Sequence, residues 1–209
     1  MPMQQTATTF APYAAPMAAG TPSKGSTTPL VNVTVAQLLL RYLALEGVDR
    51  MFGIPGAAVM HLLNELKNQR GQFQYVICRQ ETGAVFMADC YSRVSGKLGV
   101  VVVTSGPGAT NAVTGSMNAL NSGVPLLTLT GEVAEQYFGM GYLQEGTDAS
   151  LNVDAIYANS DAYSALVSNA SNFQTLFAQA LRDALSLPHH ASHISLPDDV
   201  AGTALANVH

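Results

Sequence analysis

The amino-acid sequence predicts an α/β protein: a three-layer α/β/α sandwich around a mostly parallel, six-stranded, doubly wound sheet. Two observations lead to this prediction. Apolar runs of strand length alternate along the chain with segments whose apolar residues recur at helical spacing. Two of these runs, residues 98–104 and 125–130, are almost unbroken, which is typical of central parallel strands buried on both faces.

The first 30 residues are rich in Ala, Thr, Pro and Ser and lack apolar periodicity, so we expect a disordered tail. The ordered domain is expected over residues 31–200. Thr34 is a candidate cap for its first helix, which runs through VAQLLLRYLALEGV and ends at Gly47. Residues 198–209 show no pattern of their own, and residues 201–209 resemble the start of an interdomain linker.

The other elements follow from the same two patterns and from Gly and Pro at their ends. In order, we expect a strand at 50–54, a helix at 57–67, a strand at 73–78, a helix at 81–94, a strand at 98–104, a helix at 107–120, a strand at 125–130, a long loop at 131–151, a strand at 162–167, a helix at 172–186 and a strand at 193–196. A loop of that length inside a domain is usually functional.

The composition limits the class of protein. The 209 residues correspond to about one domain, and 48% of them are hydrophobic, enough for a sizeable core. The net charge is −5 without any basic run, so we expect no nucleic-acid binding. No apolar run approaches the roughly 18 residues of a membrane span, so we expect no membrane contact. Because only 11% of residues are charged, the surface is either covered by a partner or neutral and rich in Ser, Thr and Asn.

The chain has two cysteines, Cys78 and Cys90. Their number and spacing fit neither a disulfide framework nor a zinc site. We interpret both as reduced core thiols of a cytoplasmic protein, with a reactive thiol at Cys78 as the alternative.

Two stretches fall where strands are expected to end. The first, CRQETGAVFMADCYSR at 78–93, places the acid Glu81 at the start of a helix. The second, TSGPGATN at 104–111, is a Gly-Pro-Gly turn between a strand and a helix. Ligands of open α/β sheets bind beyond the carboxyl ends of the strands, so both stretches are expected to face one crevice. Two simpler interpretations stay open at this point: a plain strand-to-helix turn, and an acid that interacts with the helix dipole.

Further candidates are the turn Ile54-Pro55-Gly56 and the loop residues Gln144 and Glu145. The Gly-Pro-Gly turn matches neither a Walker loop nor a dinucleotide fingerprint. The histidines lack matched partners at a catalytic or metal-binding spacing, and no Ser/His/Asp order or nucleophile elbow is present; the four concerned are His61, His189, His190 and His193. We expect these histidines to be ordinary structural residues.

Taken together, these segments resemble the pyrimidine-binding domain of thiamine-diphosphate-dependent enzymes, in the acetolactate synthase and pyruvate oxidase branch. The resemblance covers about residues 31–200 and rests on five pieces: EGVDRMFGIPG at 46–56, RQETGAVFMADCYSRVSGK at 79–97, TSGPGATNAVTG at 104–115, VPLLTLTGEV at 124–133 and LQE at 143–145. Ile54 stands where acetolactate synthases typically carry an aromatic residue, and Leu143 where they typically carry Phe. Another 2-oxo-acid decarboxylase or carboligase therefore stays open.

The resemblance implies roles for individual residues. In the family, a glutamate hydrogen-bonds a ring nitrogen of the aminopyrimidine and favours the imino tautomer, and Glu81 matches that glutamate. Pro107 and Asn111 would line the pyrimidine pocket together with Ile54, Pro55 and Gly56. Gln144 would point toward the reacting carbon.

The resemblance also implies partners and cofactors. Family members hold the diphosphate through Mg²⁺ in a second domain, whose Gly-Asp-Gly…Asn signature does not occur here. Some members also carry a middle domain that binds FAD. We therefore expect a crevice completed by the diphosphate-binding domain of a partner subunit, a homodimer or homotetramer, and a small 2-oxo-acid substrate.

Two other hypotheses belong to different classes. In the first, the chain is a non-catalytic stand-alone regulatory or assembly domain, or a truncated remnant that lacks the diphosphate-binding domain. The enzyme hypothesis likewise expects the 209 residues to be inactive by themselves. In the second hypothesis, the chain is a generic nucleotide-binding domain, which would require a phosphate-binding loop.

Overall fold

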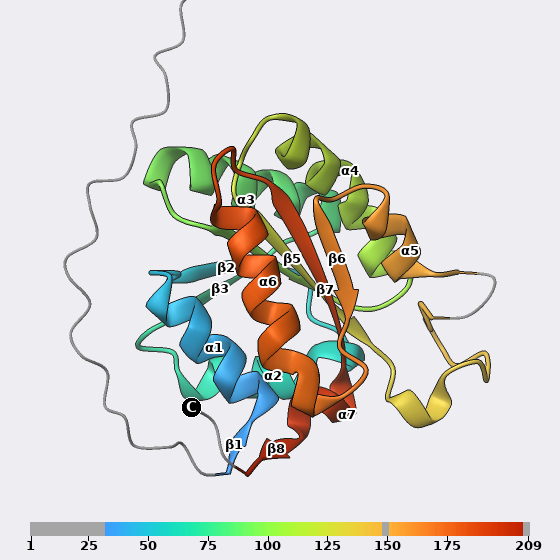
Figure 1. Cartoon of the computed structure of the whole chain (residues 1–209). Helices are drawn as coiled ribbons and strands as arrows, with labels where there is room; N and C mark the ends of the chain where they lie inside the picture. Colours follow the sequence, from blue (N-terminus) through green and yellow to red (C-terminus); the bar gives the residue numbers. More distant parts are fainter. Residues whose placement is uncertain (1–31, 148–150, 207–209) are drawn as a thin grey trace, which may run out of the picture.

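The computed structural model describes residues 32–147 and 151–206, so the expected tail at residues 1–30 lies outside the described residues. One six-stranded sheet, parallel throughout, organises the fold in the order β3-β2-β4-β5-β7-β6 (Figure 1). Its strands are β2 (Arg50–Gly53), β3 (Gln74–Ile77), β4 (Gly99–Val103), β5 (Leu126–Glu132), β6 (Tyr163–Leu166) and β7 (Ala191–Pro197). The predicted fold class is confirmed.

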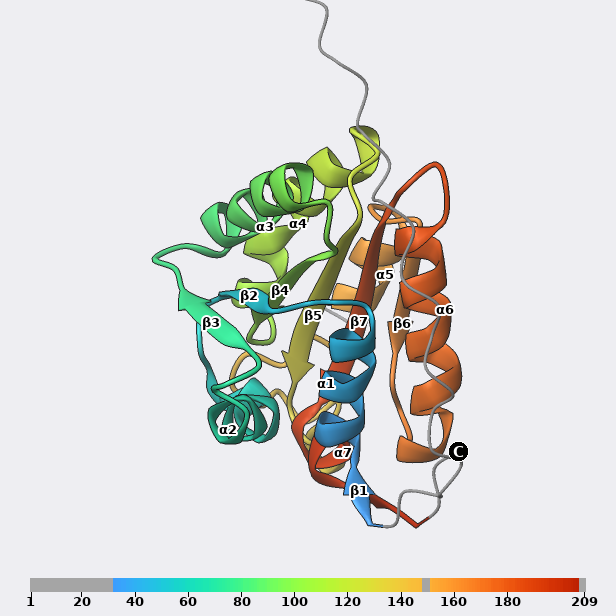
Figure 2. The same ribbon diagram turned by 90° about the vertical axis from the view of Figure 1, so that its left-hand side faces the viewer.

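Helices cover both faces of this sheet, as Figure 2 shows from a second direction. The helices are α1 (Val35–Leu45), α2 (Met60–Asn68), α3 (Glu81–Ser95), α4 (Pro107–Asn121), α5 (Val153–Ala158), α6 (Phe173–Leu185) and α7 (Asp198–Gly202), with short 3-10 turns at Ala57–Val59, Glu135–Tyr137 and Ala170–Asn172. Helices α1, α2, α6 and α7 contribute to one core cluster, whereas α3 and α4 pack on the opposite face.

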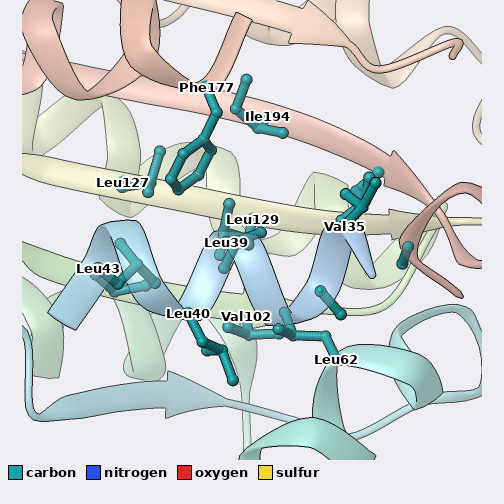
Figure 3. Close-up of a cluster of buried hydrophobic side chains, with 14 of the residues drawn as sticks. Val35, Leu39, Leu40, Leu43, Leu62, Val102, Leu127, Leu129, Phe177 and Ile194 are labelled. Atoms are coloured by element: carbon teal, nitrogen blue, oxygen red, sulfur yellow. The ribbon is translucent and has the colours of Figure 1, made fainter. Parts of the chain in front are cut away.

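The larger core lies beneath α1 and α6. Figure 3 shows apolar side chains of these helices meeting those of the central strands, including Leu39, Val102, Leu127 and Phe177. Helix α1 presents a wholly apolar stripe because its apolar residues recur every three to four positions. Its start is fixed by the predicted cap, since Thr34 and Gln37 form a reciprocal capping box.

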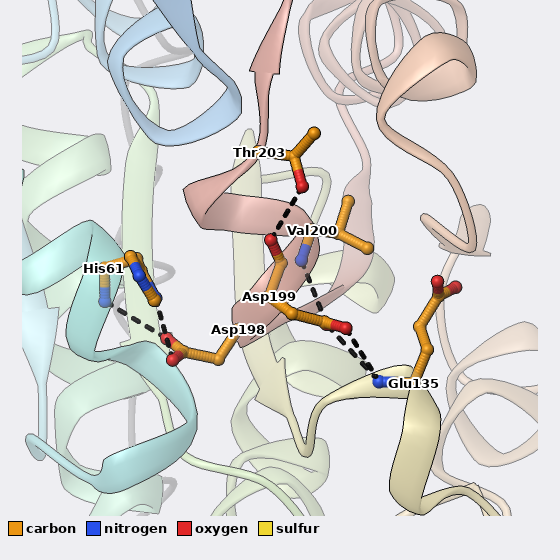
Figure 4. Close-up of polar contacts among 6 residues, drawn as sticks. All are labelled: His61, Glu135, Asp198, Asp199, Val200 and Thr203. Atoms are coloured by element: carbon orange, nitrogen blue, oxygen red, sulfur yellow. Dashed lines mark hydrogen bonds and ion pairs between the residues drawn. The ribbon is translucent and has the colours of Figure 1, made fainter.

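The secondary structure near the carboxyl end of the chain differs from the prediction. Residues 198–209 were expected to have no element, but α7 and the short strand β8 (Ala204–Leu205) lie there, and β8 pairs with β1 (Val33–Thr34) in a separate antiparallel sheet. Figure 4 shows how α7 is held: Asp198 accepts hydrogen bonds from the backbone N–H and the ring of His61, at 3.1 Å and 2.8 Å. Five residues are too few for a helical period to be visible in the sequence.

Further elements differ from the predictions, and β7 begins at Ala191, two residues before the expected start. Helix α5 lies where no element was expected, and β5 continues two residues further, to Glu132. The first turn of α5 is capped by the Asn152 side chain, which accepts from Ala155 N at 2.8 Å. Among the described residues, no helix has the length and apolar character needed to cross a bilayer.

Candidate functional site

Three loops meet at the carboxyl ends of the neighbouring strands β3, β2 and β4. The turn after β2 carries Ile54, Pro55 and Gly56, the turn after β3 leads to Glu81, and the turn after β4 contains Gly106. Because β3, β2 and β4 are neighbours and parallel, these ends lie at one edge of the sheet. The structure thus brings together the two stretches that the sequence singled out.

Glu81 is buried at the centre of this edge, with only 9% of its surface exposed. Its Oε2 accepts a hydrogen bond from Asn111 Nδ2 at 3.1 Å. Among the described residues no ion pair involves Glu81, and its Oε1 has no hydrogen-bond partner. A buried carboxyl that has no cation beside it and one free oxygen is suited to sharing a proton with a ligand.

Two glycines pack against Thr104 beside this carboxyl, and we call Gly56, Gly108 and Thr104 the glycine cradle. A Cβ added at Gly56 would lie 2.4 Å from Thr104 Oγ1, and one added at Gly108 would lie 2.7 Å from Thr104 Cγ2 and 3.6 Å from Glu81 Oε1. These glycines therefore allow the turns after β2 and β4 to approach each other closely. Thr104 Oγ1 is buried and has no hydrogen-bond partner among the described residues, so it can bond a ligand. The sequence motif around the Gly-Pro-Gly turn does not by itself point to Thr104.

Asn111 is held through both its side chain and its backbone. Its side chain donates to Glu81, and its carbonyl oxygen accepts from Thr82 Oγ1 at 2.5 Å. Thr82 belongs to α3 and Asn111 to α4, so these bonds join the first turns of the two helices that carry the site. The neighbouring Pro107 stands at the first position of α4 and is exposed.

Gln144 reaches the site through its backbone. A Cβ added at Gly106, which has φ of +55°, would lie 2.6 Å from the Gln144 carbonyl oxygen. The long loop after β5 therefore packs directly on the Gly-Pro-Gly turn. The Gln144 residue is exposed and has φ of +62°, a left-handed conformation that is uncommon outside glycine.

Pro55 lies toward a different hollow. It is exposed and lines a groove of about 610 Å³ between α2 and the edge strand β3, together with Lys67, Arg70 and Tyr75. Ile54 is half-buried beside it. Of the three residues in this turn, Gly56 is the one that belongs to the glycine cradle beside Glu81.

A buried polar group beneath α5 was also missed. Ser116 donates to both carboxylate oxygens of Asp161 at 2.8 Å, and burial raises the pKa of Asp161 to about 7.

His193 is fully buried, and burial lowers its pKa to about 3. Its ring nitrogens lie 2.9 Å from Thr130 Oγ1 and 2.8 Å from Ser164 Oγ, as expected for a structural histidine.

The outer surface of α3 and α4 carries exposed apolar side chains next to the site. Phe86 and Met87 on α3 and Met117 on α4 are 40%, 45% and 50% exposed. Cys90 lies one turn beyond Met87 and is exposed as well, so the prediction of a core thiol is wrong for it. Cys78 is half-buried, and both thiols are free.

The described residues contain no group of three or more His, Cys, Asp or Glu side chains that could hold a metal ion. What they offer is a buried carboxyl, a carboxamide that orients it, an unpaired hydroxyl and two closely packed glycine turns. Such a set fits a flat polar ring with donor and acceptor atoms on its edge, as in an aminopyrimidine.

Comparison with known proteins identifies the family of this chain. Residues 33–151 match the family model described as thiamine pyrophosphate enzyme, N-terminal TPP binding domain. The chain is 33% identical over 180 residues to the acetolactate synthase catalytic subunit, mitochondrial, of Saccharomyces cerevisiae, which covers 86% of this chain and 25% of that protein.

Two bacterial relatives match a shorter part. Identity is 47% over 110 residues to the acetolactate synthase large subunit of Lactococcus lactis and 44% over 110 residues to the acetolactate synthase isozyme 3 large subunit of Escherichia coli. Each alignment covers 53% of this chain and 19% of the relative, so the chain corresponds to a fraction of these proteins. The family match extends over more than half of the sequence and includes all the strand-end turns described above, and the chain belongs to the family of thiamine pyrophosphate enzymes, as their N-terminal TPP binding domain.

Proposed function

We propose that this chain is the pyrimidine-binding domain of a thiamine-diphosphate-dependent 2-oxo-acid decarboxylase or carboligase of the acetolactate synthase type. The observation that carries the proposal is Glu81: a buried carboxyl at the strand ends, oriented by Asn111, with one oxygen free and 3.6 Å from the position that a Cβ at Gly108 would occupy. The names of the relatives support the reaction class.

In this proposal each residue has a distinct task. Thiamine diphosphate, when bound, supplies the carbon nucleophile that the side chains of proteins lack. Glu81 holds the proton that is shared with a nitrogen of the pyrimidine ring, and Asn111 keeps its carboxyl in place. The unpaired Thr104 hydroxyl offers a further hydrogen bond, and Gly56 and Gly108 allow the turns after β2 and β4 to pack closely around Thr104.

Other residues act at the rim. Pro107, at the exposed start of α4, and the half-buried Ile54 are assigned apolar contacts with the ligand, whereas Pro55 lines the groove between α2 and β3. Gln144 is placed at the Gly-Pro-Gly turn. We assign to Gln144 a contact with the reacting part of the substrate, because it is the exposed polar residue that the long loop brings to Gly106.

We further propose that a second domain completes the site and holds the diphosphate and Mg²⁺. The exposed apolar side chains of α3 and α4 support this, since they lie on the helices that carry Glu81 and Asn111. A partner subunit in a homodimer or homotetramer would cover them and supply this domain. FAD in a middle domain and a cytoplasmic location stay predictions.

The experiment that tests the proposal is equilibrium dialysis of the 209-residue chain against thiamine diphosphate. Weak binding is expected from wild-type protein, because the diphosphate contributes little without its own domain. Glu81→Gln should weaken binding at least tenfold, whereas Glu46→Gln, a matched loss of one carboxylate at the exposed end of α1, should leave it unchanged. Equal binding by all three proteins would contradict the role of Glu81, and no binding by any of them would favour a regulatory or assembly domain.

A further inference from the structure

The loop between β5 and α5 is held by carboxylates, and we call residues 133–147 the pinned loop. Glu145 is the central one: it is only 7% exposed although it lies in a loop. Its carboxylate accepts backbone N–H groups of Gly139, of Gly141 at 3.0 Å and of Tyr142 at 3.1 Å. Three convergent donors compensate a buried negative charge and fix the path of the chain around it.

Two other carboxylates hold the ends of the pinned loop. Glu132 is fully buried and accepts from Val133 N at 2.8 Å and from Gly146 N at 3.1 Å. Glu132 thus joins the two ends of the loop, and near its start Asp199 of α7 accepts from the backbone N–H of Glu135 at 3.2 Å (Figure 4). The pinned loop is therefore attached to the sheet and to α7, and Glu145 determines the shape of the part between them.

Gln144 lies between these attachments in a conformation that needs support. Its φ of +62° is left-handed, and its carbonyl oxygen and Cα lie 2.6 Å and 3.2 Å from the position that a Cβ at Gly106 would occupy. A Cβ at Gly146 would lie 2.5 Å from Glu132 Oε2. A residue is held in such a conformation only where its surroundings determine it, and such residues concentrate at functional sites.

We propose that Glu145 is a positioning residue for Gln144: its carboxylate folds the segment Gly139–Tyr142 into the ring that holds Gln144 against the Gly-Pro-Gly turn. The proposal rests on the proposed function, in which Gln144 contacts the reacting part of the substrate. Active-site side chains need such support from residues that do not touch the substrate themselves.

The test is nuclear magnetic resonance of the isotope-labelled 209-residue chain. The close approach of Gln144 Cα to Gly106 predicts a strong nuclear Overhauser effect between their Hα protons in the wild type. In Glu145→Gln this signal should fall at least threefold, and the amides of Gly141 and Tyr142 should exchange with solvent at least tenfold faster. Glu135→Gln is the matched control in the same loop. It keeps the backbone bond to Asp199 and should change neither quantity.

A milder variant keeps the test decisive in case Glu145→Gln unfolds the chain. Thr147→Val removes a hydroxyl that donates to Glu145 at 3.3 Å and keeps the volume of the side chain. It should lower the Gly106–Gln144 signal by less than Glu145→Gln does. If Glu145→Gln loses the dispersed amide signals of β4 and β5, Thr147→Val decides: a lowered signal supports the proposal and an unchanged one overturns it.

The positioning role is also overturned if Glu145→Gln stays folded and keeps the Gly106–Gln144 signal, even where its melting temperature falls. Adding thiamine diphosphate to the same samples separates this outcome from a failure of the proposed function. If the cofactor shifts the Asn111 amide while the Gly106–Gln144 signal is independent of Glu145, only the positioning role fails. If the cofactor shifts nothing while the signal depends on Glu145, the proposed function fails and the positioning of Gln144 stands.

Discussion

The two faces of the sheet are built differently. The face beneath α1, α2, α6 and α7 is an apolar core in which Leu39, Leu43, Phe173 and Phe177 are fully buried. Helices α3 and α4 on the other face bury small residues, such as Ala88 and Ala112, and expose large ones, such as Phe86. Glu81, Gly108 and Asn111 all belong to the helices of this second side.

This difference suggests a division of tasks. The first face contributes most of the hydrophobic stabilisation, since stabilisation scales with the apolar area removed from water. The second face keeps two helices close together through small residues and leaves its large apolar residues for a partner. Four predictions test this comparison, and the fifth concerns the site itself.

The largest effect is expected in the first core. Phe177→Ala should lower the free energy of unfolding by about 3 to 5 kcal/mol, because it leaves a cavity beneath α6 and removes the stacking on Phe173 at a centroid distance of 5.1 Å. Urea unfolding followed by circular dichroism measures this. A loss below about 1 kcal/mol would show that the face beneath α1 and α6 is not the main source of stability.

The next effect depends on pH. Burial raises the pKa of Asp161 to about 7, so between about pH 4 and pH 7 the native protein binds more protons at this site than the unfolded chain. The free energy of unfolding should therefore fall as the pH rises through this range, by about 2 to 4 kcal/mol from this group. Above pH 7 the contribution stays lost.

Asp161→Asn isolates this contribution, because Asn can still accept from Ser116. The variant should be more stable than the wild type at pH 8 and should have a flatter dependence of unfolding free energy on pH. Parallel stability curves of the two proteins would show that Asp161 titrates normally and is not buried as described.

A smaller effect is expected where α3 and α4 touch. A Cβ at Gly115 would lie 2.6 Å from the Cβ of Val85, so Gly115→Ala should cost about 1 to 2 kcal/mol despite the better helix propensity of Ala. Gly83→Ala is the matched control on α3, because its Cβ would meet nothing within 4 Å. It should stabilise the chain by about 0.5 to 1 kcal/mol. Effects of the same sign would argue against close packing of the two helices.

The smallest effect is expected on the exposed surface of α3 and α4. Met117→Ala should change the unfolding free energy by less than about 0.5 kcal/mol at micromolar concentration, because half of the residue is exposed. Sedimentation velocity on the same samples gives the state of association. A cost above about 1.5 kcal/mol in a monomeric chain would place Met117 in a core and would remove this surface as a site for a partner.

The sequence predicted the parallel sheet well, because unbroken apolar runs such as Val100–Val103 are specific to strands buried on both faces. It did not predict α5, because only Val153 and Tyr157 of its six residues are buried and no period is visible. It placed Cys90 in the core, although the residue follows Met87 by one turn on the exposed side of α3.

The site was predicted in part. Glu81 and the Gly-Pro-Gly turn could be found because glycines and an acid at strand ends are visible in the sequence. Thr104 could not be found, because its importance lies in a hydroxyl left without a partner between two glycines. Glu132 and Glu145 bind backbone N–H groups, which are present in every sequence, so no residue pattern predicts their role.

The most direct test of the central claim is where an aminopyrimidine binds. In ¹H–¹⁵N spectra of the 209-residue chain, 4-amino-2-methylpyrimidine should shift the amides of Thr82, Gly108 and Asn111, which lie near Glu81, and of Gly56, which packs on Thr104. Glu81→Gln should abolish these shifts while the amides of α6 stay in place. Shifts confined to the groove around Lys67, or shifts that persist in Glu81→Gln, would contradict the assignment of Glu81 as the centre of the site.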